Sequence, residues 1–136
     1  MLRIGKEFAD DMIAHALQDD PNECCGILAG TDETLAKLYR ITNSSPSPYR
    51  YQMESQGIMK TMLDSERNGW DMLAFYHSHT HSPAYPSQTD VRLAVESGWL
   101  DIAYVLVSLE HKGAPQIRAF HITESGDIVE DELEVS

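Results

Sequence analysis

The feature that most constrains this chain is a His-Ser-His segment at residues 77–79, followed after seven further residues by Ser-Gln-Thr-Asp at residues 87–90. On a strand, His77 and His79 leave the same face about 7 Å apart. Asp90, in the first turn of an expected helix, can reach the same point. A catalytic zinc usually takes three protein ligands of these kinds and keeps a fourth position for a water whose pKa falls to about 7. The segment therefore predicts a strand, a loop and a helix built around one zinc ion, as in a metal-dependent hydrolase.

The rest of the chain reads as intermixed helices and strands of a single domain, residues 1–136. Apolar residues recur at helical spacing over residues 6–19, 55–67 and 87–98. Apolar runs bounded by turn residues predict strands over 23–30, 34–41, 72–76, 102–109 and 117–122. Residues 43–48 and 81–86 are expected loops, 49–53 reads as extended, and the acidic segment 127–135 is expected to be an edge strand. This order predicts an α/β fold with a central sheet flanked by helices.

The acidic composition limits the kinds of partner that the chain can bind. The chain carries ten Lys and Arg against 22 Asp and Glu, a formal charge of −12, which repels phosphate backbones and anionic membrane surfaces. No apolar stretch approaches the length needed to cross a bilayer, and residues 1–7 lack the apolar run of a signal peptide. We therefore expect a cytoplasmic protein that has neither nucleic acid nor a membrane as its partner.

Two further groups of potential metal ligands fit the site less well. Cys24 and Cys25 are adjacent, so they are poor candidates for a structural disulfide, and on a strand their thiols point to opposite faces. His81 lies two residues beyond His79, but Pro83 interrupts the strand pattern between the site and the next helix. His81 is therefore expected in a pocket wall rather than as a ligand.

Three residues near the predicted site leave alternatives open. Ser87 and Asp90 match a capping box ahead of an apolar helix, and capping alone explains both. Glu23 opens an apolar strand, where it is either the general base that a metal-bound water needs or a turn charge exposed to water. Its position supports these two roles equally. If the site is catalytic, the Ser87 hydroxyl can stabilise a developing oxyanion.

Together, Glu23, His77, His79, Ser87 and Asp90 resemble the JAMM motif of the MPN-domain metallopeptidases, with all five signature positions at the family spacing. The resemblance implies a zinc ion held by His77, His79 and Asp90, with Glu23 as general acid and base and Ser87 as oxyanion stabiliser. It implies a mixed β-sheet flanked by helices, in the cytidine-deaminase-like architecture of that family. It also implies hydrolysis of an amide or isopeptide bond, often at the C-terminus of a ubiquitin-like protein.

Within the family, the small size and residues 85–90 are similar to the prokaryotic branch. That similarity implies release of cysteine from the C-terminus of a small sulfur-carrier protein, a step in cysteine biosynthesis. The alternatives are a deubiquitinase-like isopeptidase acting on another ubiquitin-like tag, and a non-catalytic MPN scaffold or binding module. A nucleoside deaminase is not expected, because the Pro-Cys-x-x-Cys and His-x-Glu elements of that class do not occur. The acidic segment 127–135 is a candidate for pairing with a second copy in a homodimer, or for receiving a substrate tail.

Overall fold

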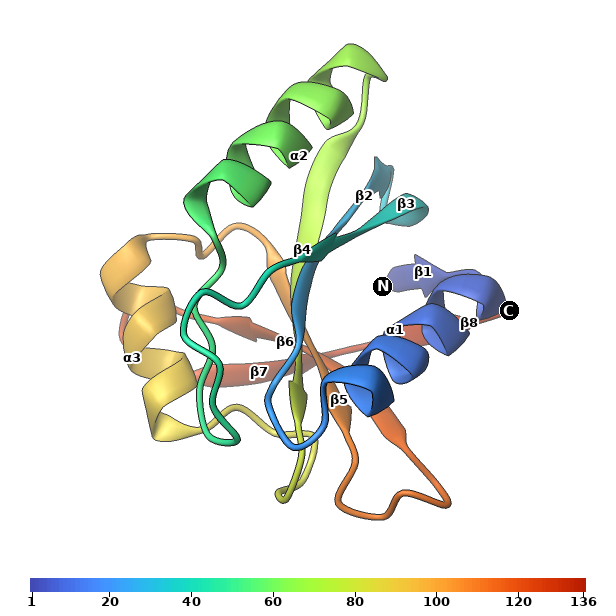
Figure 1. The fold of residues 1–136 in the computed structure, drawn as a ribbon. Coiled ribbons are helices and arrows are strands. Elements are labelled where there is room, and N and C mark those ends of the chain that lie inside the picture. Colours follow the sequence, from blue (N-terminus) through green and yellow to red (C-terminus); the bar gives the residue numbers. More distant parts are fainter.

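An eight-stranded mixed β-sheet forms the centre of the structure, a computed structural model that describes residues 1–136 (Figure 1). The strands are β1 (Leu2–Ile4), β2 (Cys25–Thr31), β3 (Thr34–Ile41), β4 (Asp71–His79), β5 (Ala103–Ser108), β6 (Gln116–Ile122), β7 (Ile128–Asp131) and β8 (Leu133–Val135). The helices are α1 (Lys6–Asp19), α2 (Ser55–Arg67) and α3 (Gln88–Ser97). The strand order is β7-β6-β5-β4-β2-β3-β1-β8. Because β1 is parallel to β3 and β8, β4 is parallel to β5 and the other neighbours are antiparallel, the predicted α/β fold with a mixed sheet is confirmed.

The three helices begin and end close to where the sequence predicts them. The bounds of α1 and α2 coincide with the expected ranges 6–19 and 55–67. Helix α3 begins after Ser87, which caps it, and ends before Gly98, whose φ of 77° lies in the left-handed region that favours glycine. None of the three helices is long and apolar enough to cross a membrane.

The sheet separates two apolar cores. Helix α1 contributes Met12 and Ala16 to the core on one face, whereas α2 and α3 pack on the other face (Figure 1). Cys24 belongs to the first core and Cys25 to the second, so the two thiols point to opposite faces as expected, and both are buried. Burial raises the pKa of each thiol to about 12, which leaves them protonated and unreactive at neutral pH.

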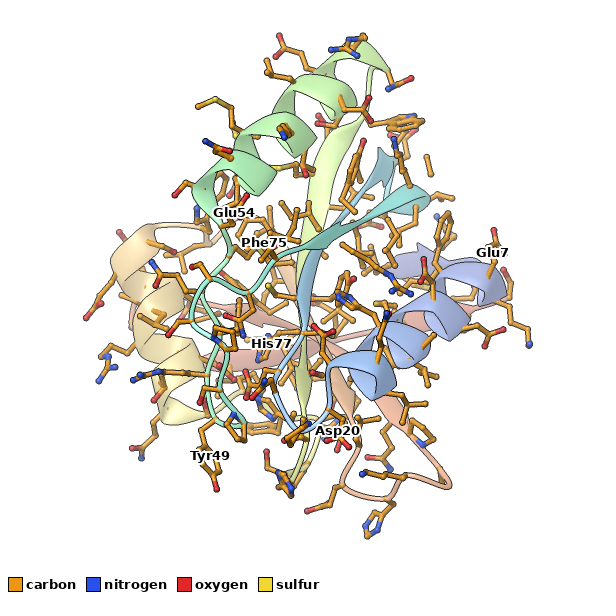
Figure 2. The ribbon with its side chains drawn as sticks, viewed as in Figure 1. Glu7, Asp20, Tyr49, Glu54, Phe75 and His77 are labelled. Atoms are coloured by element: carbon orange, nitrogen blue, oxygen red, sulfur yellow. The ribbon has the colours of Figure 1, made fainter.

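Strand β4 delivers the histidines to the second face of the sheet. Phe75 packs in the core under α2 and α3, and the period of two along a strand turns His77 and His79 to the same side. Figure 2 shows Phe75 and His77 in the middle of the molecule. Because β2 runs antiparallel to β4, with Cys25 opposite His77, the residues just before β2 lie beside the end of β4. Sheet pairing thus brings Glu23 near the histidines although the two segments are far apart in the sequence.

The expectation of one edge strand over residues 127–135 is wrong. The structure divides this segment into β7, which pairs with β6, and β8, which pairs with β1, with only Glu132 between them. These two strands lie at opposite ends of the strand order, so the sheet must curve until its two ends meet at Glu132. Alternating apolar and acidic residues fit one long strand and two short ones equally, so the pattern does not reveal the division. Pairing of either edge with a second copy stays a prediction.

Residues 49–53, expected to be extended, form no strand. A single antiparallel bridge between Asn43 and Met53 closes residues 43–53 into a loop, which we call the 43–53 loop. It connects β3 to α2 and lies against the end of the sheet that carries His77.

Candidate metal centre

Three ligand atoms from β4 and α3 converge on one point. The Nε2 atoms of His77 and His79 lie 3.2 Å apart, and Oδ2 of Asp90 lies 3.1 Å from the first and 2.9 Å from the second. Atoms bound tetrahedrally at about 2.0–2.1 Å from a zinc ion lie roughly 3.3 Å from one another. The donor set and its spacing therefore fit zinc, and no other group of His, Cys, Asp or Glu converges in this way.

The two histidine rings are oriented by different contacts. Nδ1 of His79 donates a hydrogen bond to the carbonyl of Pro83 at 2.9 Å, which directs the lone pair of Nε2 toward the ligand cluster. Nδ1 of His77 is buried without a partner. Instead, the ring of Tyr51 stacks on the His77 ring, with centroids 4.4 Å apart and planes 27° from parallel. The stacking of Tyr51 and the contacts of Nε2 with His79 and Asp90 thus orient His77, with no hydrogen bond at Nδ1.

Ser87 and Asp90 form a capping box, and Asp90 also faces the histidines. The Ser87 hydroxyl oxygen accepts from the Asp90 backbone N–H at 3.0 Å, and Oδ2 of Asp90 accepts from the Ser87 backbone N–H at 2.9 Å. Burial raises the pKa of Asp90, but the charge of His77 and the hydrogen bonds from His77, His79 and the Ser87 backbone outweigh it and hold the pKa well below its ordinary range. The capping role and the ligand geometry therefore coexist in the same side chain.

Glu23 is a buried carboxyl beside this cluster. Only 4% of its surface is exposed, and its Oε1 has no hydrogen-bond partner. Burial raises the pKa of Glu23 to about 7, although the charges of His77 and His79 act to lower it. A turn charge exposed to water would show none of these properties, so that alternative for Glu23 does not hold.

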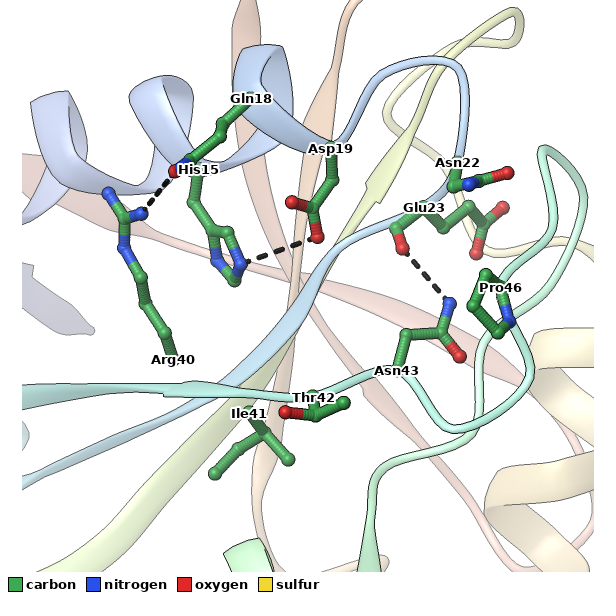
Figure 3. A pocket seen from close by; sticks show the side chains of 10 residues that line it. All are labelled: His15, Gln18, Asp19, Asn22, Glu23, Arg40, Ile41, Thr42, Asn43 and Pro46. Carbon is green, nitrogen blue, oxygen red and sulfur yellow. Dashed lines mark hydrogen bonds and ion pairs between the residues drawn. The ribbon is translucent and has the colours of Figure 1, made fainter.

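Two cavities adjoin the site. Glu23 lines a polar cavity of about 500 Å³ between α1 and β3, in which Ile41 is the one apolar residue (Figure 3). Asp90 lines a second cavity of about 240 Å³, which is mostly apolar and includes Tyr51 and Trp99. The site therefore has a polar side at Glu23 and an apolar side at Asp90.

The raised pKa of Glu23 predicts a pH-dependent effect on stability. In the metal-free protein the uncharged carboxyl is favoured by folding, so its contribution is complete below pH 4.5 and is lost as the pH rises through about 7. Replacing Glu23 by Gln removes this loss. We expect the chelator-treated Glu23→Gln variant to exceed the chelator-treated native protein in unfolding free energy by about 2–3 kcal/mol at pH 8, and to match it near pH 4.5. Urea denaturation at pH 8 and at pH 4.5 measures the two unfolding free energies. An equal difference between the variant and the native protein at both pH values would contradict a raised pKa of Glu23.

His81 is not part of the cluster. Its side chain is exposed, and its Nδ1 lies 2.8 Å from the hydroxyl of Thr80. Strand β4 ends at His79, as the prolines predict. Conversely, the sequence reasoning missed Tyr51, because no spacing pattern distinguishes an aromatic residue that stacks on a ligand from one that is merely exposed in a loop.

Comparisons with known proteins identify the family of the chain. Residues 5–123 match the family model Prok-JAB, described as prokaryotic homologs of the JAB domain. A protein of Mycobacterium tuberculosis named CysO-cysteine peptidase is 35% identical over 99% of this chain and 91% of its own length. A protein of Thermus thermophilus named probable TtuB-protein conjugate cleaving protease is 30% identical over 94% of this chain and 80% of its own length.

A solution structure of a protein from Desulfitobacterium hafniense superposes with a TM-score of 0.87 at 32% identity, covering 100% of this chain and 93% of that one. The sequence, the relatives and the fold agree, and the resemblance to the JAMM and MPN proteins is confirmed. The chain belongs to the Prok-JAB family, the prokaryotic homologs of the JAB domain.

Proposed function

We propose that this chain is a zinc-dependent peptidase, a single domain over residues 1–136, that releases cysteine from the C-terminus of a small ubiquitin-like sulfur-carrier protein. One observation carries the proposal: the Nε2 atoms of His77 and His79 and Oδ2 of Asp90 converge within 3.2 Å of one another beside the buried carboxyl of Glu23. The similarity to the CysO-cysteine peptidase over nearly the whole chain supports the substrate class.

The roles follow from the chemistry of the side chains. His77, His79 and Asp90 would hold the zinc ion, which acidifies water and polarises a carbonyl when it is bound. Glu23 would take a proton from the attacking water and return it to the leaving nitrogen, a role open to a buried carboxyl beside the ligand cluster. The Ser87 oxygen accepts the Asp90 N–H, so its own hydroxyl proton remains free to bind the oxyanion of the substrate.

Ser87 allows its two roles to be separated by substitution. Gly starts a helix almost as well as Ser but has no side chain that could donate a hydrogen bond, so Ser87→Gly is expected to change stability by less than about 0.5 kcal/mol. Turnover is expected to fall by about 10²–10³-fold, as when one oxyanion donor is removed. Thermal denaturation and initial rates measure both effects, with Ser87→Thr as the control that keeps the hydroxyl. Full turnover in Ser87→Gly would leave Ser87 with capping alone.

A second substrate class has its own support. The relative from Thermus thermophilus is named for cleaving a protein conjugate rather than for releasing a free amino acid. An isopeptidase acting on such a conjugate would use the same groups.

We also propose a cytoplasmic location, which the two free, buried cysteines support because neither needs an oxidising compartment.

The test is an intact-mass assay on two forms of a sulfur-carrier protein. One ends in Gly-Gly-Cys, and the other is joined through its C-terminal glycine to a lysine side chain. The zinc-loaded protein is expected to remove one cysteine from the first form, whereas chelator-treated protein leaves it intact. Cleavage of the conjugate alone would favour the isopeptidase, and cleavage of neither by zinc-loaded protein would refute the proposal.

A further inference from the structure

The side chain of Asn43 joins three separate pieces of backbone. Its Nδ2 donates to the carbonyl of Glu23 at 3.0 Å, and its Oδ1 accepts from the backbone N–H groups of Ser45 and Gln52, both at 3.0 Å. Figure 3 shows the contact with the Glu23 carbonyl. The partners fix the orientation of the amide, because the reversed side chain would set its NH₂ against two N–H donors. Asn43 therefore ties both arms of the 43–53 loop to the segment that carries Glu23.

The backbone of Glu23 is held by this loop rather than by the sheet. Strand β2 begins only at Cys25, two residues later. The N–H of Glu23 donates to the carbonyl of Ser47 at 2.8 Å, and its carbonyl accepts from Asn43, so both polar groups bind the 43–53 loop. The same loop carries Tyr51, whose ring stacks on His77. One loop thus contacts both the residue that bears the carboxyl and the ring of a metal-ligand candidate.

We propose that Asn43 is a positioning residue, which fixes the carboxyl of Glu23 relative to His77 through the 43–53 loop. The inference rests on the proposed function, in which Glu23 moves protons between water and the leaving nitrogen. Proton transfer needs heavy atoms within hydrogen-bond reach, and displacements of about 1 Å can lower a rate about 100-fold. All three hydrogen bonds of the Asn43 side chain go to backbone groups, and none goes to a ligand side chain.

Asn43→Asp isolates the contact with Glu23. A carboxylate still accepts from Ser45 and Gln52 but has no proton to donate to the Glu23 carbonyl. Asn43→Ala loses all three hydrogen bonds and serves as the uncharged comparison. The matched control is Ser44→Ala, which loses the hydrogen bond from the Ser44 hydroxyl to the Gln52 carbonyl, 3.1 Å long and also within the loop.

For Asn43→Asp we expect kcat to fall roughly 10- to 100-fold, with KM and zinc content unchanged. Asn43→Ala is expected to lose at least as much, and Ser44→Ala to keep the native rate. In a Glu23→Gln background, Asn43→Asp is expected to lower the rate by less than about twofold, because the group that it positions is gone. An equal loss in both backgrounds, in step with loss of thermal stability, would overturn the inference and leave Asn43 a structural role.

Amide hydrogen exchange of the metal-free protein tests, without any substrate, whether loss of the Asn43 contact loosens the backbone of Glu23, whose N–H donates to the Ser47 carbonyl. In Asn43→Asp, exchange at the Glu23 N–H is expected to quicken while the N–H groups of Ser45 and Gln52 stay protected. Unchanged exchange at Glu23 would overturn the inference even if the native protein is active. If exchange changes as expected in Asn43→Asp but the native protein cleaves neither carrier, the proposed function is refuted and the role of Asn43 in holding Glu23 stands.

Discussion

Replacing Glu23 by Gln is expected to lower turnover by about 10²–10⁴-fold, the range that one general acid–base group contributes. The amide has nearly the shape of the carboxyl but can neither accept a proton from water nor return it to the leaving nitrogen. Because Glu23 is not one of the converging ligand atoms, zinc content is expected to stay at one ion per chain. Initial rates of amino-acid release, together with metal analysis of the same sample, measure both quantities.

A second carboxylate provides the control for this substitution. Asp19 lines the same polar cavity as Glu23 but pairs with His15 at 3.5 Å and lies outside the ligand cluster. Asp19→Asn is expected to keep turnover within about twofold of the native rate, because removing its charge changes no group with a role in proton transfer. If Glu23→Gln retained more than about a tenth of the native turnover, Glu23 could not be the proton-transfer group.

Replacing Asp90 by Asn is expected to weaken zinc binding by at least about 100-fold, since even the groups that support metal ligands are worth 10- to 100-fold. The substitution removes the one negative charge among the three ligand groups. The amide oxygen of Asn can still accept from the Ser87 N–H, so the start of α3 is expected to persist. Competition with a chromogenic chelator measures the affinity, and circular dichroism checks the helix.

Glu96 offers the matched control for Asp90→Asn. It lies on the same helix, is exposed, and is 4.0 Å from Arg92 across one turn. Glu96→Gln makes the same chemical change away from the ligands and is expected to leave zinc affinity unchanged, because an exposed pair of this kind contributes little. Native zinc affinity in Asp90→Asn would exclude Asp90 as a ligand.

The parts of the site that follow from local periodicity could be predicted from the sequence. His77 and His79 share a face because side chains alternate along a strand, and Ser87 starts α3 because its hydroxyl caps the first turn. The same local rules predict the bounds of α1 and α2. Each of these features depends on residues within a few positions of one another.

The parts that depend on distant segments could not be predicted in this way. The stacking of Tyr51 on His77 joins a loop to a strand, and no spacing within either segment encodes it. The burial of Glu23 follows from the pairing of β2 with β4, which joins segments far apart in the sequence. From its position in the sequence alone, an exposed turn charge and a buried base are equally well supported. The division of residues 127–135 depends on the curvature of the whole sheet, which strand periodicity does not report.

The meeting of β7 and β8 at Glu132 has a consequence for synthesis of the chain. Leu2 pairs with Leu133, and β6 pairs with β7, so both edges of the sheet are completed by residues 128–135. While a ribosome still holds these residues, β1 and β6 expose unpaired backbone groups, which can recruit strands of other chains. The sheet of the nascent protein therefore cannot be completed strand by strand from the N-terminus. Its edges stay open to aggregation until these eight residues have left the ribosome.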